Sequence, residues 1–394
     1  MRPRILIFCE HYLPGNKSGG GMWTVVNLVD RFSDQYDFFV VTRNHDGKAD
    51  SKPYSSVQTG SWNTVRGHQV YYVDPKYFGV AAASDLFREV DPQLVFLNSA
   101  FSLTGRMFLE ARRKHRIPEV PVVLAPCGEV SDGCMSIKPL KKLLFLKYAN
   151  LFGLYENVIW KASAKEEFDD IRRRIGDRAE IMTAPDLLPR SILPDFDTSM
   201  KPDKSPGHIK LVTVARITQK KNLLYLLERL TKLGDCEVEL EVIGPIEDQR
   251  YWEECQSFIY RLPPNIRVNA TGNLEYSEVL QRMTNSHFFV LPTLHENFGY
   301  VFVEAMAAGC PLLLSENTIW ENINKANAGC TIPLDEKSGW EAKLRQFAEM
   351  DQAEFREMSS SARRFAVRWL ESSVDLTSNQ RVFDRALGDI HLGQ

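Results

Sequence analysis

Short apolar segments alternate along the chain with longer segments whose apolar residues recur every three or four positions. The short segments are rich in β-branched residues and predict buried strands, and the longer ones predict helices. Strands alternating with helices are typical of a mostly parallel sheet covered on both faces. In the first half the predicted strands are 4–9, 37–42, 69–73, 93–98, 120–125, 157–162 and 179–183, and the predicted helices are 25–32, 82–90, 103–115 and 165–175.

A second strand–helix series follows a segment, residues 185–208, that holds five prolines and has no clear periodicity. Such a segment is typical of a hinge between domains. The sequence therefore predicts an α/β protein with two Rossmann-like domains, residues 1–190 and 208–372. The predicted strands of the second half are 209–214, 239–243, 266–268, 288–293 and 311–315, and its predicted helices include 223–233, 301–308, segments within 338–372, and 379–387.

Polar loops follow several predicted strands of the first half. Parallel strands with right-handed crossovers place these loops at one edge of the sheet, so loops 10–21, 98–102, 126–136 and 162–164 should share a rim. The first loop ends in Gly19, Gly20 and Gly21, just ahead of a helix, where a glycine backbone can approach a ligand closely. It lacks the Gly-x-Gly-x-x-Gly spacing of dinucleotide sites. From the residues alone, a flexible loop is the preferred interpretation.

One stretch of the second half combines a strand, a polar loop and a helix start. The apolar run 287–293 precedes a loop that contains Asn297, Phe298 and Gly299, and a helix follows until Gly309 and Pro311 stop it. The free N–H groups and positive end of such a helix favour an anion. Two carboxylates, Glu296 and Glu304, frame this helix start, where a purely structural helix would not need them.

Two cations follow strand 209–214 at the start of the next helix. Arg216 and Lys221 are electrostatically unfavourable there unless an anion lies between them. A diphosphate suits the pair, because arginine can bind two oxygens while lysine acts as a point charge. Lys220 is adjacent and could serve in place of Lys221. Gly244, after the next strand, fits either a close approach to a nucleotide or a plain turn.

The composition excludes several classes of protein. A chain of 394 residues with 44% hydrophobic and 25% charged residues is globular rather than disordered. Its seven cysteines are scattered without a Cys-x2-Cys pair, which indicates a reducing compartment and argues against a zinc site. No apolar run reaches the length of a membrane span. We therefore expect a cytoplasmic protein with no resident metal, and no nucleic acid as partner.

The motif Glu-x7-Glu at 296–304, followed by Ala-x-Ala-x-Gly-x-Pro at 305–311, resembles the donor site of the retaining glycosyltransferases of family 4. The pattern Arg-x4-Lys-Asn at 216–222 resembles the diphosphate clamp of the same family. The resemblance implies the GT-B fold, in which two Rossmann-like domains face each other across a cleft. It also implies that the C-terminal helix, within 373–394, joins the first domain.

The resemblance further implies a function. The enzyme would move a sugar from a UDP- or GDP-linked donor to a hydroxyl of a glycan or glycolipid, in polysaccharide or lipopolysaccharide biosynthesis. The nucleotide sugar is a substrate, so no cofactor is expected. The implied catalytic residues are Glu296, Arg216 and Lys221. The implied donor-binding residues are Gly19, Gly20, Gly21, Gly244, Asn297, Phe298, Gly299 and Glu304, with Glu304 on the ribose and Glu296 on the sugar.

Two residues depart from the family pattern. Cys127 stands where the family usually has the arginine of Pro-Arg-Gly, and Lys161 stands where a Trp-His-Ala motif has its histidine. Both positions would lie on the acceptor or sugar side of the reaction centre. The departures weaken the transfer of acceptor chemistry from the family. A sugar-nucleotide epimerase with the same fold and a non-catalytic nucleotide-sugar binder therefore remain alternatives.

A basic, leucine-rich segment extends from Lys138 to Lys147. Family members often touch a membrane through a basic, apolar surface of the first domain. Here Lys147 falls on the same helical face as Leu140, Leu144 and Leu151, so the amphipathic separation is poor. A partly buried helix with extended lysines is the preferred interpretation. We expect weak, salt-sensitive contact with the inner face of a membrane.

Overall fold

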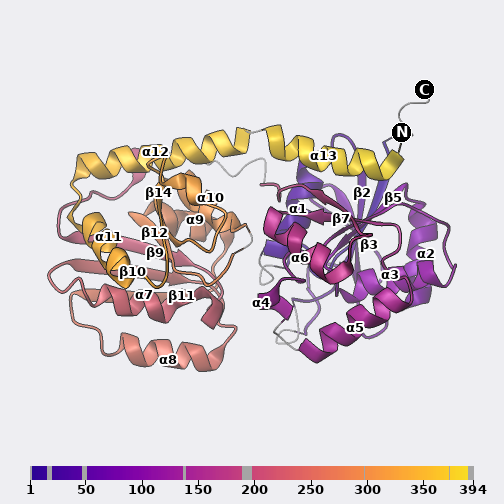
Figure 1. Ribbon diagram of the computed structural model, residues 1–394, viewed down its shortest axis with the longest axis horizontal. Helices are drawn as coiled ribbons and strands as arrows, with labels where there is room; N and C mark the ends of the chain where they lie inside the picture. The colour runs from indigo at the N-terminus through magenta and orange to yellow at the C-terminus, as the bar shows by residue number, and fades with distance from the viewer. Residues whose placement is uncertain are drawn as a thin grey trace. The chain divides into compact units, whose positions relative to one another are not determined.

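The computed structural model describes residues 2–15, 20–46, 51–135, 139–188, 198–296, 298–371 and 373–388. The chain divides into two compact units (Figure 1). The first unit comprises Met1–Arg190 and Ser373–Gln394, and the second comprises Ser191–Ser372. Each unit contains one sheet with helices packed against it, which is the α/β architecture that the alternation of strands and helices predicts.

The first unit has an eight-stranded sheet in the order β3-β4-β2-β1-β5-β6-β7-β8. All seven predicted strands are present, and they pair in parallel. An additional short strand, β3, pairs antiparallel with β4 at the edge. The strands are β1 (Arg4–Phe8), β2 (Asp37–Arg43), β3 (Trp62–Val65), β4 (His68–Val73), β5 (Leu94–Asn98), β6 (Val122–Ala125), β7 (Val158–Ala162) and β8 (Glu180–Thr183).

Side chains of the first sheet alternate between two apolar cores. Leu6 and Phe8 belong to one core, whereas Ile5 and Ile7 belong to the other. Phe383 of the C-terminal helix lies in the second core, 5.4 Å from the ring of Phe32. The helices are α1 (Gly20–Phe32), α2 (Val80–Val90), α3 (Leu103–Arg113), α4 (Asp132–Met135), α5 (Pro139–Leu151), α6 (Lys165–Ile175) and α13 (Ser373–Leu387).

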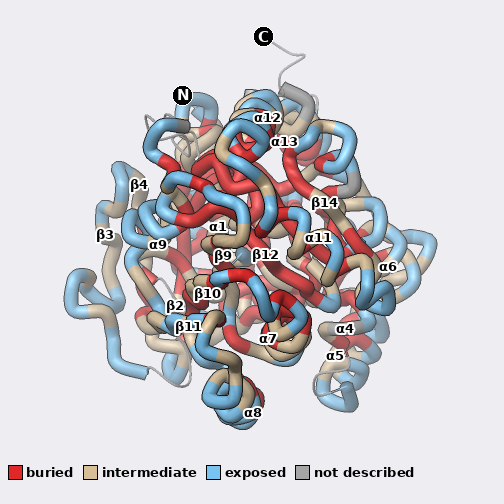
Figure 2. The backbone as a smooth tube through the Cα atoms, turned by 90° about the vertical axis from the view of Figure 1, so that its left-hand side faces the viewer, coloured by how far each residue is buried: buried red, intermediate tan, exposed pale blue. Residues whose placement is uncertain are grey.

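The second unit has a six-stranded sheet in the order β11-β10-β9-β12-β13-β14, with parallel pairing throughout its described strands. The five predicted strands are present, and β14 is additional. The strands are β9 (His208–Val214), β10 (Glu237–Ile243), β11 (Ile266–Gly272), β12 (Phe288–Leu291), β13 (Leu312–Ser315) and β14 (Gly329–Ile332). Figure 2 shows β12, in the middle of this sheet, as buried and the outer loops as exposed.

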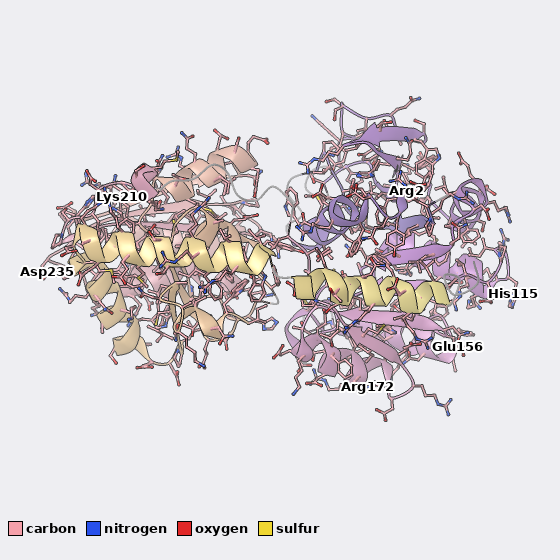
Figure 3. The ribbon with its side chains drawn as sticks, turned by 90° about the horizontal axis from the view of Figure 1, so that it is seen from above. Arg2, His115, Glu156, Arg172, Lys210 and Asp235 are labelled. Carbon is pink, nitrogen blue, oxygen red and sulfur yellow. The ribbon has the colours of Figure 1, made fainter. Side chains whose placement is uncertain are left out.

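Six helices are described in the second unit. One core is closed by stacking of Phe288 on Phe347, whose ring centroids lie 4.1 Å apart. Charged side chains such as Lys210 and Asp235 lie toward the outside of this unit (Figure 3). The helices are α7 (Leu223–Leu230), α8 (Gln249–Ile259), α9 (Tyr276–Thr284), α10 (Tyr300–Ala307), α11 (Lys337–Glu349) and α12 (Gln352–Glu371).

Helix α5 is partly buried, as preferred from the sequence, but its leucine stripe faces outward. Leu146 and Ala149 are buried, whereas Leu140, Leu144 and Leu151 are 76%, 67% and 78% exposed. Phe145 and Tyr148 add to the inner contacts of the helix, whereas these three leucines stay uncovered within the unit. None of the described helices is both long and apolar enough to cross a membrane.

Candidate functional site

The loop between β12 and α10 forms the helix start that the sequence predicts as an anion site. Gly299 caps α10 with a positive φ of 76°. A Cβ at this position would lie 2.4 Å from the Phe302 ring, so both backbone and packing require glycine. A helix start favours an anion, because its first N–H groups lack carbonyl acceptors one turn earlier in the helix. In α10 the Phe302 N–H already donates to the Gly299 carbonyl at 2.9 Å. Asn297 lies outside the described residues.

Neighbouring loops hold this segment in place. The backbone N–H of Leu294 donates to the Lys220 carbonyl at 2.8 Å, and the Glu296 N–H donates to the Asn317 carbonyl at 3.1 Å. The indole N–H of Trp320 donates to the Phe298 carbonyl at 2.6 Å. Because β12 lies between β9 and β13, loops following all three strands meet here.

Lys221 and Glu296 form a mostly buried ion pair, with the ammonium group on the carboxylate. Burial alone would raise the pKa of Glu296, but the charge of Lys221, assisted by Lys220 and Arg216, brings that pKa below its ordinary value. Burial lowers the pKa of Lys221, although Glu296 opposes this shift. Glu296 is therefore ionised at neutral pH and is in direct contact with a cation.

Arg216 occupies a more open position. Its guanidinium is 2.6 Å from the Glu247 carboxylate, and both side chains are about half exposed. An exposed pair of this kind contributes at most about 1 kcal/mol, so the guanidinium can exchange the carboxylate for a bound anion at little cost. The ammonium group of Lys220 makes no ion pair within the described part of the chain, while its carbonyl accepts from Leu294.

The backbone at Gly244 lies close to another segment of the protein backbone. Its φ is 143°, and a Cβ there would lie 2.1 Å from the carbonyl oxygen of Ala215. Any side chain would push the end of β10 away from the residue that precedes Arg216. Gly244 thus positions the cation-bearing loop, a role that the sequence alone did not separate from a nucleotide contact or a turn.

Glu304 points from the first turns of α10 toward α9. Its carboxyl group is hydrogen-bonded to the Tyr276 hydroxyl, and burial raises the pKa of Glu304 to about 7. The carboxyl group therefore titrates closer to neutral pH than an exposed glutamate does. Tyr276 was not predicted as a site residue, because no local pattern connects the first residue of α9 with α10.

In the first unit, Lys161 is paired within the protein. The residue is 2% exposed, and its Nζ atom is 3.0 Å from Oδ1 of Asp186. The Thr24 hydroxyl lies 3.1 Å from Oδ2 of the same carboxylate and 3.2 Å from the Gly20 carbonyl oxygen. The lysine at the family's histidine position therefore connects, through Asp186, with the start of α1.

Cys127 is also engaged. It adopts a left-handed conformation with φ of 52°, and its Sγ atom is 3.0 Å from Oδ1 of Asn98. Asn98 in turn donates from Nδ2 to the Gly21 carbonyl at 2.8 Å. Burial, assisted by Asp186, raises the pKa of the Cys127 thiol well above its ordinary value.

The carboxyl ends of β1, β5, β6 and β7 lie side by side, so the predicted rim of the first sheet is confirmed. Gly20, Gly21, Cys127 and Lys161 gather there, while Gly19 lies outside the described residues. In the second unit, the strand ends bring together Arg216, Lys221, Gly244, Glu296, Phe298, Gly299 and Glu304. No group of three or more potential metal-ligating side chains occurs among the residues that the structure describes.

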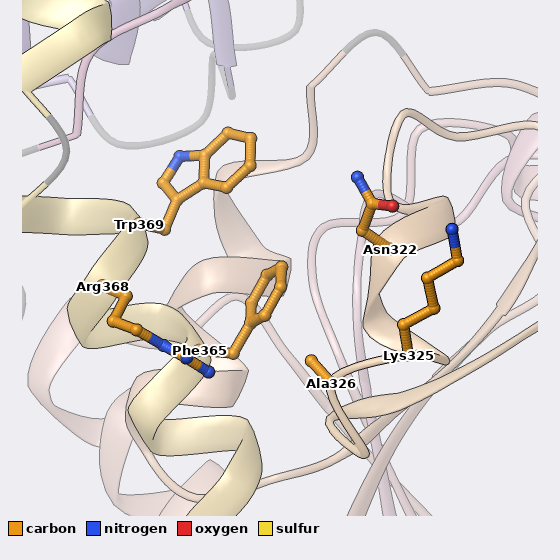
Figure 4. Close-up of a pocket in the computed structure, with 6 residues that line it drawn as sticks. All are labelled: Asn322, Lys325, Ala326, Phe365, Arg368 and Trp369. Carbon is orange, nitrogen blue, oxygen red and sulfur yellow. The ribbon is translucent and has the colours of Figure 1, made fainter.

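A further cavity of about 500 Å³ lies between α12 and the segment after β13 (Figure 4). Trp369 on its wall packs against Trp320, with ring centroids 4.7 Å apart. The wall is therefore continuous with the residue that holds the Phe298 carbonyl. Its lining residues are Asn322, Lys325, Ala326, Phe365, Arg368 and Trp369.

Residues 195–365 match the family described as glycosyl transferases group 1. An uncharacterized glycosyltransferase of Methanocaldococcus jannaschii is 29% identical over 105 residues, a match that spans 27% of this chain and 26% of that relative.

Solved structures resemble the whole chain. HepE of Anabaena, in complex with UDP and glucose, has a TM-score of 0.68 at 17% identity, covering 98% of this chain and 99% of that one. WaaG, a glycosyltransferase involved in lipopolysaccharide biosynthesis, has a TM-score of 0.66 at 13% identity, covering 98% and 100%. The likeness to these structures shows the GT-B fold for the chain, and its residues 195–365 match the glycosyl transferases group 1.

Proposed function

We propose that this protein transfers a sugar from a UDP-linked donor to a hydroxyl group of a glycan or glycolipid, with retention of configuration. The buried pair of Lys221 and Glu296 at the start of α10 is the observation that carries the proposal. The pair places a cation that would bind a diphosphate beside an ionised carboxylate that would bind a sugar. The likeness to HepE bound to UDP and glucose supports the choice of donor.

The reaction breaks the bond between the anomeric carbon and the diphosphate. Arg216, Lys221 and the N–H groups at Phe298 and Gly299 would stabilise the negative charge of the leaving diphosphate. Because these fixed charges can take that role, we propose that no resident metal is needed. The phosphates repel Glu296, which would therefore bind the sugar hydroxyls, close to the positive charge that develops as the bond breaks.

The acceptor hydroxyl forms the new bond to the anomeric carbon, and its proton would pass to a phosphate oxygen of the departing UDP. Two acids of the first unit, Glu129 and Glu167, already accept hydrogen bonds from the protein. Ser99 donates to Glu129, and the backbone and hydroxyl of Ser163 donate to Glu167. Neither is proposed as a covalent nucleophile. The glycine-tipped start of α1 would contribute N–H groups to the donor phosphates.

A panel of UDP-, GDP- and ADP-sugars in thermal denaturation tests the donor, because a ligand that binds the folded state raises the melting temperature. Incubation of UDP-glucose with and without glycan acceptors then separates the remaining alternatives. A transferase needs the acceptor, an epimerase alters the sugar without one, and a binder shows neither reaction. Acceptor-independent turnover would overturn the proposal.

We also propose peripheral contact with the inner face of a membrane through α5. The exposed stripe of Leu140, Leu144 and Leu151 includes Lys147 and is flanked by Lys141. Leucine side chains can enter the interface between headgroups and acyl chains, while lysines are attracted by anionic lipids. Such contact would bring the enzyme to a glycolipid acceptor.

The clamp predicts weaker donor binding when either cation is removed. Arg216→Ala and Lys221→Ala should each weaken UDP binding by about 1.5–3 kcal/mol, the value of a charge-assisted hydrogen bond. Calorimetry in the presence of EDTA measures this effect without divalent metal. Arg250→Ala, which removes an exposed arginine of α8, is the matched control.

Lys221→Ala also leaves Glu296 without its partner, so the double variant Lys221→Ala/Glu296→Gln is measured beside it. Both Lys221 variants should bind UDP weakly if the ammonium contacts the diphosphate. Recovery of wild-type affinity in the double variant, together with an unaffected Arg216→Ala, would contradict the clamp.

The two glutamates should differ in kinetics. Glu304→Gln should raise the donor KM more than it lowers kcat, since the ribose is unchanged by the reaction. Glu296→Gln removes a charge near the developing cation, so kcat should fall by more than KM rises. Steady-state kinetics with the identified acceptor measures both. Normal turnover of Glu296→Gln with a pure kcat loss in Glu304→Gln would mean that the roles are reversed.

The pKa of Glu304, raised by burial to about 7, predicts a pH dependence. A ribose hydroxyl that donates to the carboxylate favours its ionised form, so UDP affinity should rise with pH through about 7. The folded protein also retains a proton that the unfolded chain releases above about pH 4.5. The free energy of unfolding should therefore fall between pH 4.5 and 7.

Calorimetry and urea unfolding across this range measure both effects, and Glu304→Gln serves as the reference. The phosphate of UDP titrates equally with either protein, so the difference between them isolates Glu304. Equal pH profiles for the two proteins would show that Glu304 does not titrate in this window.

The α5 surface predicts binding to anionic vesicles that salt reduces but does not abolish. Lys141→Gln/Lys147→Gln should lose the salt-sensitive part, and Leu140→Ser/Leu144→Ser/Leu151→Ser should lose the part that survives about 1 M salt, where the Debye length is about 3 Å. Co-sedimentation with phosphatidylglycerol vesicles measures both. Tyr260→Ser, an exposed aromatic residue of the second unit, is the control. Equal binding by all variants would contradict a role for α5.

A further inference from the structure

Cys127 and Lys161, the two departures from the family pattern, both connect with the first turn of α1. We propose that they are positioning residues that hold this glycine-tipped turn in place, and that neither acts on the acceptor. The inference rests on the proposed function in taking the start of α1 as a contact of the donor phosphates. The two connections reach α1 through different side chains.

The first connection passes through a buried ion pair. Lys161 lies in the middle of a strand that is buried throughout, and its ammonium is 3.0 Å from Asp186. The other carboxylate oxygen is 3.1 Å from the Thr24 hydroxyl, which is also 3.2 Å from the Gly20 carbonyl. A lysine with this burial has no path to a substrate. Its ammonium group instead holds one oxygen of Asp186, while the other oxygen faces the helix start.

The second connection passes through an amide. The Cys127 thiol is 3.0 Å from the side-chain oxygen of Asn98, whose NH₂ group donates to the Gly21 carbonyl at 2.8 Å. The thiol fixes which end of the amide faces Gly21, because Asn98 can present its NH₂ group there only with its oxygen toward Cys127. The raised pKa of Cys127 keeps the thiol protonated and able to donate.

The Cys127 connection ends on the Gly21 carbonyl, and the Lys161 connection ends on the Thr24 hydroxyl, whose single hydrogen is shared between Asp186 and the Gly20 carbonyl. Gly20 and Gly21 have no side chains of their own to anchor the turn. The middle of α1 is fixed by other contacts. The Asn27 side chain donates to the Leu187 carbonyl at 2.8 Å, and Val25 and Leu28 are buried in the core. Met22 of the first turn also packs into this core, so it is the glycine end of the turn that depends on the two connections. Without the two connections its N–H groups would sample several directions, which weakens binding of an anion that needs them in one place.

Hydrogen exchange and kinetics together test the proposal. Cys127→Ala removes the donor to Asn98, whereas Cys127→Ser keeps one. The alanine variant should speed amide exchange at residues 24–28 by about two- to tenfold, the equivalent of one hydrogen bond, and should raise the KM for UDP-glucose by a similar factor. The serine variant should resemble wild type in both measurements. Cys134→Ala is the matched cysteine control.

The lysine connection needs a variant that folds. Lys161→Met alone leaves Asp186 buried without its partner, so Lys161→Met/Asp186→Leu is measured as well, because it removes both charges. It should speed exchange at residues 24–28 without changing exchange in β9 of the second unit. Lys165→Met, an exposed lysine at the start of α6, is the control.

Wild-type exchange and wild-type KM in Cys127→Ala would overturn the proposal. So would a lower melting temperature with unchanged KM, which is the result of a merely structural role. A loss of kcat in Lys161→Met with no change in α1 exchange would instead assign Lys161 to the substrate. If wild-type protein neither binds UDP nor turns over UDP-glucose, the proposed function fails, and the exchange measurements alone still decide the positioning role.

Discussion

Parallel strand order is the constraint on which the candidate site depends. A parallel sheet sends the loop after every strand to the same edge, so residues far apart in sequence meet without any direct signal between them. In the second unit, β9 lies between β10 and β12. The loops that carry Arg216, Gly244 and Glu296 therefore converge, and hydrogen bonds such as that from Leu294 to the Lys220 carbonyl lock them together.

Charge burial at this edge explains why the site is arranged as pairs. A lone buried ammonium or carboxylate is costly, and removing one member of a buried pair strands the other. Lys221 and Glu296 satisfy each other before any substrate arrives. Their arrangement contributes little net stability, but it keeps two opposite charges oriented in a poorly hydrated place. Fixed charges of this kind stabilise a charge-separating transition state without having to reorganise during the reaction.

The sequence predicts the strands well where apolar, β-branched runs are buried on both faces. It misses β3 and β14, because the segments Trp62–Val65 and Gly329–Ile332 are short and partly exposed and so lack such runs. The candidate site residues that belong to a motif could be predicted from that motif. Their partners Tyr276, Trp320 and Asp186 were missed, because each contact is made by tertiary packing between distant segments and leaves no local pattern.

Tertiary partners also change how Cys127 and Lys161, the two departures from the family pattern, are interpreted. Reading Cys127 and Lys161 by side-chain chemistry alone suggests an altered or lost reaction, because a thiol and an ammonium replace the family's guanidinium and imidazole. The structure supplies partners for both. Asp186 compensates the buried charge of Lys161, and the Asn98 amide matches the Cys127 thiol. A substitution that comes with its own buried partner changes the framework of a site, and the chemistry of the site can then remain with the residues that keep their groups open to the substrate.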